Sequence, residues 1–172
     1  MIEKIATIKE KGGIELNDVD ALSLPVSKQE TDLAILFEIP ERKDQEKPGR
    51  ILQMIWDKRF PLVKGMAGAY VYAVTITSGG ARPGNHYHKK RKEIYFVLSG
   101  TVEVLLENIA TKKLQRCFLG DKPQALYIKP GVAHVVVPYT DHSILLVIAD
   151  SPNSDGDEFG YEISRQTLVD TA

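Results

Sequence analysis

The sequence predicts an all-β protein built as an antiparallel sandwich or barrel. Short segments rich in Val, Ile, Tyr and Phe recur along the chain and are separated by Gly, Pro, Asn and Asp residues, which is the pattern of strands and turns. A hydrophobic period near 3.6, which would indicate helices, is almost absent. Many short strands with turns between them are typical of antiparallel sandwiches and barrels.

The expected strands can be placed in order along the chain. Residues 33–38 are apolar and bounded by turn residues, which predicts a buried strand. Further strands are expected at residues 50–56, 69–77, 93–98, 101–107, 113–119, 126–129, 133–137 and 143–149. Ser99 and Gly100 form a tight hairpin signal between two of these strands. Residues 163–169 are the one segment with a helical pattern.

Residues 33–172 are expected to form a single domain, preceded by an N-terminal arm or edge strand at residues 1–32. The chain of 172 residues is long enough to bury a core of ordinary size. Residues 4–8 are expected to form a short edge strand, while residues 14–31 are polar and irregular. Residues 40–49 are highly charged and are expected to form a solvated surface loop.

Composition and charge limit the classes of function. A net charge of −1 gives no indication of a nucleic acid or a membrane as partner. No window is apolar enough to span a bilayer, and the N-terminus lacks the apolar core of a signal peptide. The single cysteine, Cys117, excludes an intramolecular disulfide and is expected to be a buried thiol. These features predict a cytoplasmic protein.

Four potential metal ligands occur in two short stretches. Residues i and i+2 of a strand point to the same face, so the imidazoles of His86 and His88 can converge on one point. A turn at residues 89–92 would let the next strand run back beside the first and bring in the Glu93 carboxylate. His134 is the fourth candidate. Three neutral nitrogens and one carboxylate oxygen suit a divalent transition metal such as zinc, iron(II), manganese or nickel.

This pattern resembles the first signature of the cupin superfamily, which is glycine, five residues, His-x-His, a short gap, Glu, six residues and glycine. Each spacing is matched by Gly80, His86, His88, Glu93 and Gly100. The stretch from Gly120 to His134 resembles the second signature of the superfamily. The resemblance implies a double-stranded β-helix, or jelly-roll barrel, with the metal and the substrate inside its mouth.

Within the superfamily, the chain resembles dTDP-4-dehydrorhamnose 3,5-epimerases and dTDP-4-keto-6-deoxyhexose 3,4-ketoisomerases. The matching residues are Gly49 and Arg50, Arg82 before residues 86–89, residues 128–134, and residues 157–160. The resemblance implies proton abstraction next to the carbonyl of a phosphorylated or nucleotide-linked sugar. Metal-free epimerases use a histidine at the position of His86 as general base. A metal-bound His86 has no lone pair left for that role, so the metal would polarise the carbonyl instead.

Catalytic and substrate-binding residues follow from the same reasoning. The candidates for catalysis are Glu93, Tyr95 and Tyr127, because a tyrosine near the metal could move the proton. Tyr70 or Tyr72 is a further position that could face inward. The basic run at residues 89–92 could attract a phosphate or pyrophosphate, although such runs are commonly solvated turns. Arg82 is a second candidate anion contact. The expected phosphate-binding residues are Arg82, Lys90 and Lys92.

Three functions fit this sequence. The favoured one is a metal-dependent isomerase or epimerase of a sugar phosphate or sugar nucleotide, since the basic turn and Arg82 suit such a substrate. The alternatives are an iron(II) dioxygenase, which would use the same ligands, and a non-catalytic sugar- or ligand-binding cupin. A homodimer is expected because small jelly rolls leave edge strands that need covering. The segment before Leu33 could serve as an exchanged strand.

Overall fold

The structure is a computed structural model that describes residues 7–8, 14–15, 28–43, 49, 51–58, 61–77, 81–152 and 156–163. Its strands are β1 (Thr7–Ile8), β2 (Ile14–Glu15), β3 (Lys28–Glu30), β4 (Ala34–Glu38), β5 (Glu41–Lys43), β6 (Ile51–Gln53), β7 (Tyr70–Thr77), β8 (Gly84–Tyr87), β9 (Glu93–Ser99), β10 (Val102–Asn108), β11 (Leu114–Leu119), β12 (Gln124–Ile128), β13 (Val132–Pro138), β14 (His142–Ala149) and β15 (Phe159–Gly160). No helix occurs within these ranges, so none there could cross a membrane.

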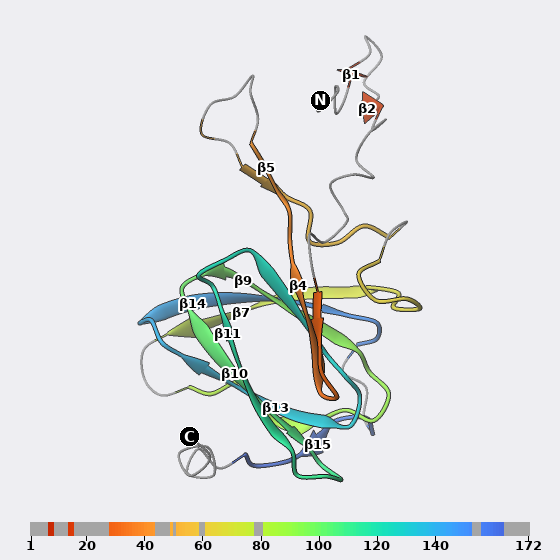
Figure 1. Cartoon of the computed structure of the whole chain (residues 1–172), viewed down its shortest axis with the longest axis vertical. Coiled ribbons are helices and arrows are strands. Elements are labelled where there is room, and N and C mark those ends of the chain that lie inside the picture. The colour runs from red at the N-terminus through yellow and green to blue at the C-terminus, as the bar shows by residue number, and fades with distance from the viewer. Residues whose placement is uncertain are drawn as a thin grey trace.

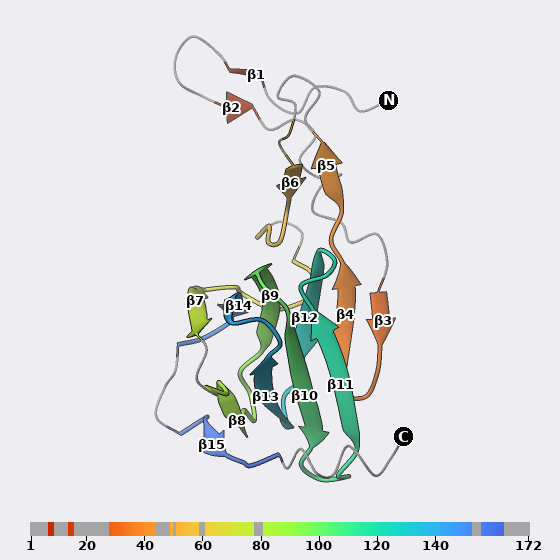
Figure 2. The same cartoon turned by 90° about the vertical axis from the view of Figure 1, so that its left-hand side faces the viewer.

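Two antiparallel sheets make up the body of the molecule. The five-stranded sheet has the order β11-β10-β13-β8-β15, and the six-stranded sheet has the order β3-β4-β12-β9-β14-β7. Figures 1 and 2 show the two sheets facing each other around a common interior. The prediction of an all-β jelly-roll barrel is therefore confirmed.

The main core lies between the two sheets. Alternate residues of β10 point inward, among them the buried Val104 and Leu106, and they meet Leu126 of β12 and Leu145 of β14. This alternation follows from the period of two along a strand, which sends every second side chain to one face. Cys117 belongs to the same core, as the sequence predicted.

A second cluster covers the outer face of the six-stranded sheet. The connector at residues 61–69 places Met66 against this face, together with Trp56 from the segment before it. Phe96 of β9 and Tyr127 of β12 belong to this outer cluster. Tyr127 is therefore separated from the barrel interior by the sheet that carries it.

The Ser99–Gly100 turn does not form a hairpin, so that prediction is wrong. The strand before it, β9, pairs with β12 and β14, whereas the strand after it, β10, pairs with β11 and β13. The turn instead carries the chain from one sheet to the other. Gly100 has a φ of +77°, and an added Cβ would lie 2.5 Å from the His142 carbonyl oxygen. The glycine thus marks a tight turn, but it does not determine which strands pair.

The segment between β4 and β7 also differs from expectation. A strand occupies Glu41–Lys43 inside the expected loop at residues 40–49, and β6 is shorter than the expected strand at residues 50–56. These two strands pair in a hairpin that projects away from the barrel (Figure 2). Strand β6 lies within the strand expected at residues 50–56, but the charged segment Glu41–Lys43 carries no apolar alternation that would have revealed it. Neither strand belongs to a core cluster in the described part of the chain.

The N-terminal segment supplies one strand to the barrel. Strand β3 pairs with β4 and forms one edge of the six-stranded sheet, and it lies within residues 1–32, the segment expected to be an arm or an edge strand. Thr7 and Ile8 pair with Ile14 and Glu15 in a separate ladder. Gly80, most of the remaining arm and residues 164–169 of the expected helix lie outside the described residues.

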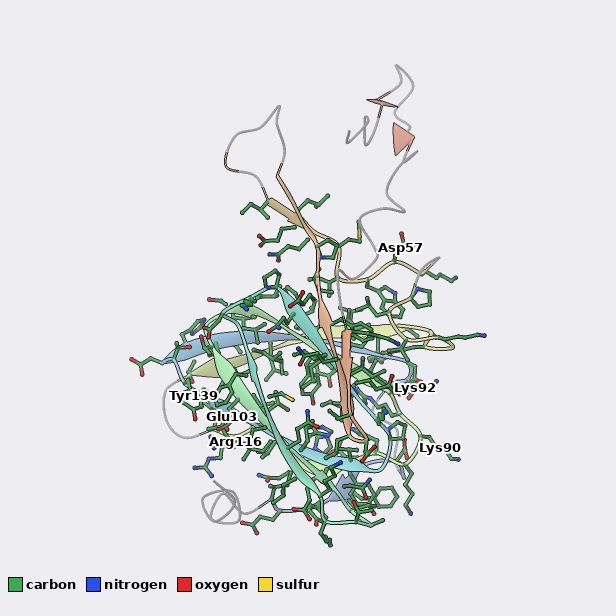
Figure 3. All side chains as sticks on the ribbon, viewed as in Figure 1. Asp57, Lys90, Lys92, Glu103, Arg116 and Tyr139 are labelled. Atoms are coloured by element: carbon green, nitrogen blue, oxygen red, sulfur yellow. The ribbon has the colours of Figure 1, made fainter. Side chains whose placement is uncertain are left out.

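One acidic side chain is buried away from the histidines. Glu103 is fully buried, and its carboxylate accepts hydrogen bonds from Arg116 Nε and from the Tyr139 hydroxyl, the latter at 3.2 Å. Figure 3 shows these three residues close together, on the opposite side of the molecule from Lys90 and Lys92. The cluster stabilises a buried charge by pairing it.

Candidate metal and catalytic site

The four predicted ligands come from both sheets. His86 of β8 and His134 of β13 lie directly opposite each other in the five-stranded sheet. Glu93 begins β9 in the six-stranded sheet, and His88 follows the end of β8. The expectation that β9 runs beside β8 is wrong, because β8 pairs with β13 and β15. The turn at residues 89–92 crosses between the sheets, so Glu93 faces the imidazoles across the interior.

The four side chains converge despite this different topology. Their ligand atoms all lie within 4.8 Å of one another. Glu93 Oε1 is 3.8 Å from His88 Nε2, and Glu93 Oε2 is 3.5 Å from His134 Nε2. His88, Glu93 and His134 are buried, whereas the His86 side chain is 20% exposed. His86 is therefore the member of the group that solvent or a substrate can reach.

The backbone fixes the orientation of two of the rings. His134 Nδ1 lies 3.3 Å from the Val132 carbonyl oxygen, and His88 Nδ1 lies 2.5 Å from the Asp157 carbonyl oxygen. A carbonyl oxygen only accepts hydrogen bonds, so each Nδ1 carries the proton and each Nε2 keeps its lone pair. Both Nε2 atoms are buried and have no hydrogen-bond partner.

Burial favours the neutral forms of His134 and His86. Burial, together with the nearby His86, lowers the pKa of His134 to about 3. Burial also lowers the pKa of His86, although the neighbouring Glu158 carboxylate opposes this shift. Both imidazoles are consequently bases with available lone pairs at neutral pH.

The residues fit a divalent transition metal. Buried acceptor atoms without partners cost free energy unless a cation or a donor meets them, and His88 Nε2 and His134 Nε2 are such atoms. Imidazole ligands of metals commonly donate their second N–H to a backbone carbonyl, as both of these rings do. Neutral nitrogens with one carboxylate suit zinc, iron(II), manganese or nickel.

Arg91 is a site residue that the sequence analysis missed. Its side chain is buried, and its Nη2 lies 3.0 Å from Glu93 Oε1. The sequence does contain a signal for this placement. Arg91, Glu93 and Tyr95 are spaced by two residues, and all three side chains face inward. The guanidinium therefore belongs to the interior, although the residues beside it in the basic run do not.

Two tyrosines complete the surroundings of Glu93. The Tyr95 hydroxyl donates to Glu93 Oε2 at 3.1 Å, and the Tyr72 hydroxyl donates to Oε1 at 3.4 Å. Arg91 Nη2 in turn donates to the Tyr72 oxygen at 3.2 Å. Burial, followed by the charge of Glu93, raises the pKa of Tyr72 to about 12 and holds the pKa of Tyr95 well above its usual value. Both phenols remain protonated and act as donors.

Tyr127, a predicted catalytic residue, is not brought into the site. It lies opposite Ile94 in the β9–β12 ladder and packs in the outer cluster with Phe96. Its neighbour Ile128 lines the small hollow beside His88 and His134. The sequence identified the strand correctly, but it did not show which alternate residues face inward, because that depends on the pairing.

Comparison with known proteins places the chain in a family. The family model FdtA, described as WxcM-like, C-terminal, matches residues 35–162. This chain belongs to the FdtA family. Among curated proteins, none matches its sequence.

Solved structures show the same fold as this FdtA-family chain. QdtA, a sugar 3,4-ketoisomerase from Thermoanaerobacterium thermosaccharolyticum in complex with TDP, is 23% identical with a TM-score of 0.60, covering 80% of this chain and 92% of that one. The dTDP-4-dehydrorhamnose 3,5-epimerase from Bacillus anthracis, with TDP and PPi bound, is 18% identical with a TM-score of 0.63, covering 80% and 82%. NovW, a 4-keto-6-deoxy sugar epimerase from Streptomyces spheroides, is 12% identical with a TM-score of 0.64, covering 78% and 72%.

The basic turn at residues 89–92 of this FdtA-family chain is bound by an acidic residue of the same chain. The backbone N–H groups of residues 89–91 bind the carboxylate of Asp157. Lys92 Nζ lies 3.4 Å from the Gly65 carbonyl oxygen, while Lys90 and Arg82 are exposed. Of the charged side chains in the turn, it is Arg91 that reaches Glu93. Phosphate binding by Arg82, Lys90 and Lys92 stays a prediction.

Proposed function

We propose that this protein is an isomerase or epimerase that moves a proton at a carbon next to the carbonyl of a nucleotide-linked keto sugar. The observation that carries the proposal is the convergence of neutral imidazoles, a carboxylate and two protonated phenols in the barrel interior. Membership of the FdtA family supports it, as do the names of the structural relatives, which are ketoisomerases and epimerases of TDP-linked sugars.

The chain's own residues can carry the proton transfers. A neutral imidazole takes a proton from the carbon next to the carbonyl. The electron pair of the broken C–H bond forms a carbon–carbon double bond, and the π pair of the carbonyl moves onto its oxygen to give an enolate, which is an enediolate where that carbon carries a hydroxyl. His86 is the reachable base, and the protonated hydroxyl of Tyr72, which is 36% exposed, is the reachable donor. Return of the proton to the other face gives an epimer. Its return to the former carbonyl carbon, with transfer of the hydroxyl proton, gives the isomeric ketone.

We also propose that a divalent transition metal is held by His86, His88, Glu93 and His134. Such an ion supplies a Lewis acid that polarises a carbonyl oxygen and stabilises negative charge on it. An imidazole whose lone pair binds a metal cannot also take a proton. His86 therefore acts either as the fourth ligand or as the base, and a substitution separates these two roles.

The proposal is tested by following proton exchange in deuterated water. Purified protein is incubated with TDP-4-keto-6-deoxyglucose, and proton NMR follows the signals of the carbons next to the carbonyl. We expect deuterium incorporation together with the signals of an isomer or epimer. The same preparation is analysed for bound metals beside the His86→Ala variant. Loss of exchange with retained metal identifies His86 as the base, whereas loss of the metal identifies it as a ligand.

Other outcomes would replace the proposal. Saturable binding of the sugar nucleotide without exchange or product, in wild type loaded with each candidate metal, would favour a binding protein. Consumption of oxygen by the iron(II)-loaded protein with a substrate would favour a dioxygenase. Exchange that persists in a preparation free of metal would refute metal dependence while leaving the isomerase proposal intact.

A further inference from the structure

The segment at residues 157–161, which includes β15, lies against β8, the strand that carries His86. Phe159 and Gly160 pair with Tyr87 and His86 of β8, and Figure 2 shows the two strands side by side. The Phe159 ring stacks on Tyr87 with centroids 5.1 Å apart, and the Tyr161 N–H donates to the Asn85 carbonyl at 2.8 Å. The backbone that carries His86 and His88 is therefore held by a segment about seventy residues later in the chain.

Asp157, at the start of this segment, anchors it to the basic turn. Its Oδ1 accepts from the N–H groups of Lys89 at 3.0 Å and Lys90 at 3.2 Å, and its Oδ2 accepts from those of Lys90 at 3.3 Å and Arg91 at 2.8 Å. Three successive backbone N–H groups around one anion form a nest. These contacts fix where the main chain of Asp157 lies relative to the turn.

The main chain of the same residue contacts His88. The Asp157 carbonyl oxygen lies 2.5 Å from His88 Nδ1, while the other side of that ring faces Glu93, with His88 Nε2 3.8 Å from Oε1. A carbonyl held at Nδ1 selects the tautomer in which Nε2 has the lone pair, and it sets the angle of the ring. The position of this carbonyl depends in turn on the carboxylate anchor.

We propose that Asp157 is a positioning residue for the site. Its carboxylate binds the turn at residues 89–91, and this contact holds its carbonyl where it fixes the tautomer and ring orientation of His88. The effect on catalysis rests on the proposed function, but the effect on the His88 ring does not.

The test reads the tautomer directly. Protein labelled with ¹⁵N-histidine and stripped of metal by a chelator is studied by long-range ¹H–¹⁵N correlation NMR at about pH 8, above the ordinary imidazole pKa. The chain has four histidines, and a His88→Gln variant assigns the His88 signals. We expect His88 in wild type to have its proton on Nδ1. In Asp157→Ala we expect a mixture of both tautomers, and in Asp157→Asn, which keeps one acceptor oxygen, partial rescue.

A matched control removes an acid from a different turn. Asp121 Oδ1 accepts from the Thr101 hydroxyl at 3.4 Å in an exposed turn, and Asp121→Ala should leave the His88 tautomer unchanged. Exchange of the substrate proton should fall roughly 10- to 100-fold in Asp157→Ala, the usual range for loss of a group that orients a histidine of the site.

Two results would overturn the proposal. One is a wild-type His88 with its proton on Nε2, which needs no Asp157 variant and holds even if Asp157→Ala fails to fold. The other is an unchanged His88 tautomer in a folded Asp157→Ala protein. Neither result depends on catalytic activity, so failure of the proposed function alone would leave the positioning role testable.

Discussion

Glu93 joins the polar groups of the barrel interior into one network. Its carboxylate accepts hydrogen bonds from both tyrosines and pairs with Arg91, while two imidazoles face it across the interior. Arg91 and Glu93 are both nearly inaccessible to solvent. A buried charge is tolerated when it is paired, and removing one partner leaves the other uncompensated.

Replacing Arg91 should therefore destabilise the protein strongly. We expect Arg91→Met to lower the free energy of unfolding by about 3–5 kcal/mol, the usual cost of breaking a buried pair. The measurement is urea denaturation of the metal-free protein. Lys90→Met is the matched control, since Lys90 is the preceding residue and is exposed, and it should change stability by less than about 0.5 kcal/mol. Equal transition midpoints for the two variants would contradict the role given to Arg91.

Cys117 should react slowly in the folded protein. It is buried in the core, and burial raises the pKa of its thiol, although Gln115 Nε2 donates to the sulfur at 3.3 Å and opposes this shift. A raised pKa means less thiolate at a given pH, and the thiolate is the reactive form. A disulfide reagent at neutral pH should thus label the urea-unfolded chain quickly and the native chain slowly. Equal labelling rates would show that the thiol is accessible.

At the scale of single residues, the sequence predicted which polar side chains converge better than it predicted their surroundings. The spacing of His86, His88, Glu93 and His134 indicated that these side chains meet, and they do, while metal binding by them stays a prediction. Arg91 was hidden in a basic run that otherwise faces solvent, and Tyr127 was placed on the wrong face. Which face a strand residue occupies depends on its partners, and a shift of one residue would exchange the two faces.

The positions of the strands along the chain were easier to predict than which strands pair with each other. The alternation in β10 and β14 marks them clearly, because one face of each packs in the core. Pairing depends on contacts far apart in the sequence, so neither the separation of β9 from β10 nor that of β8 from β9 could be read locally. The strands β3 and β5 contain charged residues and lie at the periphery of the fold, where no apolar alternation is required.

Strand β8 depends on a glycine at its first position. Gly84 has a φ of +105°, and an added Cβ would lie 2.5 Å from the His134 carbonyl oxygen and 2.9 Å from Val135 Cα. This close approach occurs where the register between β8 and β13 shifts. The glycine thus lets β8 pass close enough to β13 to bring His86 beside His134.

Substituting Gly84 should damage both stability and the site. We expect Gly84→Ala to lower the free energy of unfolding by more than about 2 kcal/mol, since backbone strain and a backbone clash add. Gly131→Ala is the matched control, because Gly131 has a φ of +79° but no atom within 4 Å of an added Cβ. Its cost should be about 1 kcal/mol, that of a left-handed conformation alone. Urea denaturation checks both values, and similar costs would refute the close-approach argument.

At the scale of the whole molecule, the four sheet edges differ in how well they are protected. Strand β15 has two residues, and β3 has three, two of which are charged. Strand β11 carries the exposed Arg116. Strand β7 has eight residues and no charge, with Tyr70 and Val71 about half exposed. Long, uncharged edge strands tend to pair with another chain. Of these four edges, β7 is therefore the one most prone to such pairing.

We propose that the protein is a homodimer that pairs through β7. Light scattering should give a mass near 38 kDa, twice the 19.2 kDa of one chain. Val71→Lys places a charge on this edge and should yield monomers, because lysine on an edge strand opposes pairing. Ile51→Lys is the matched control, since Ile51 is similarly exposed but lies on the projecting hairpin. A wild-type monomer would refute dimerisation, and a dimer that survives Val71→Lys would shift the interface to the strand exchange expected from the segment before Leu33.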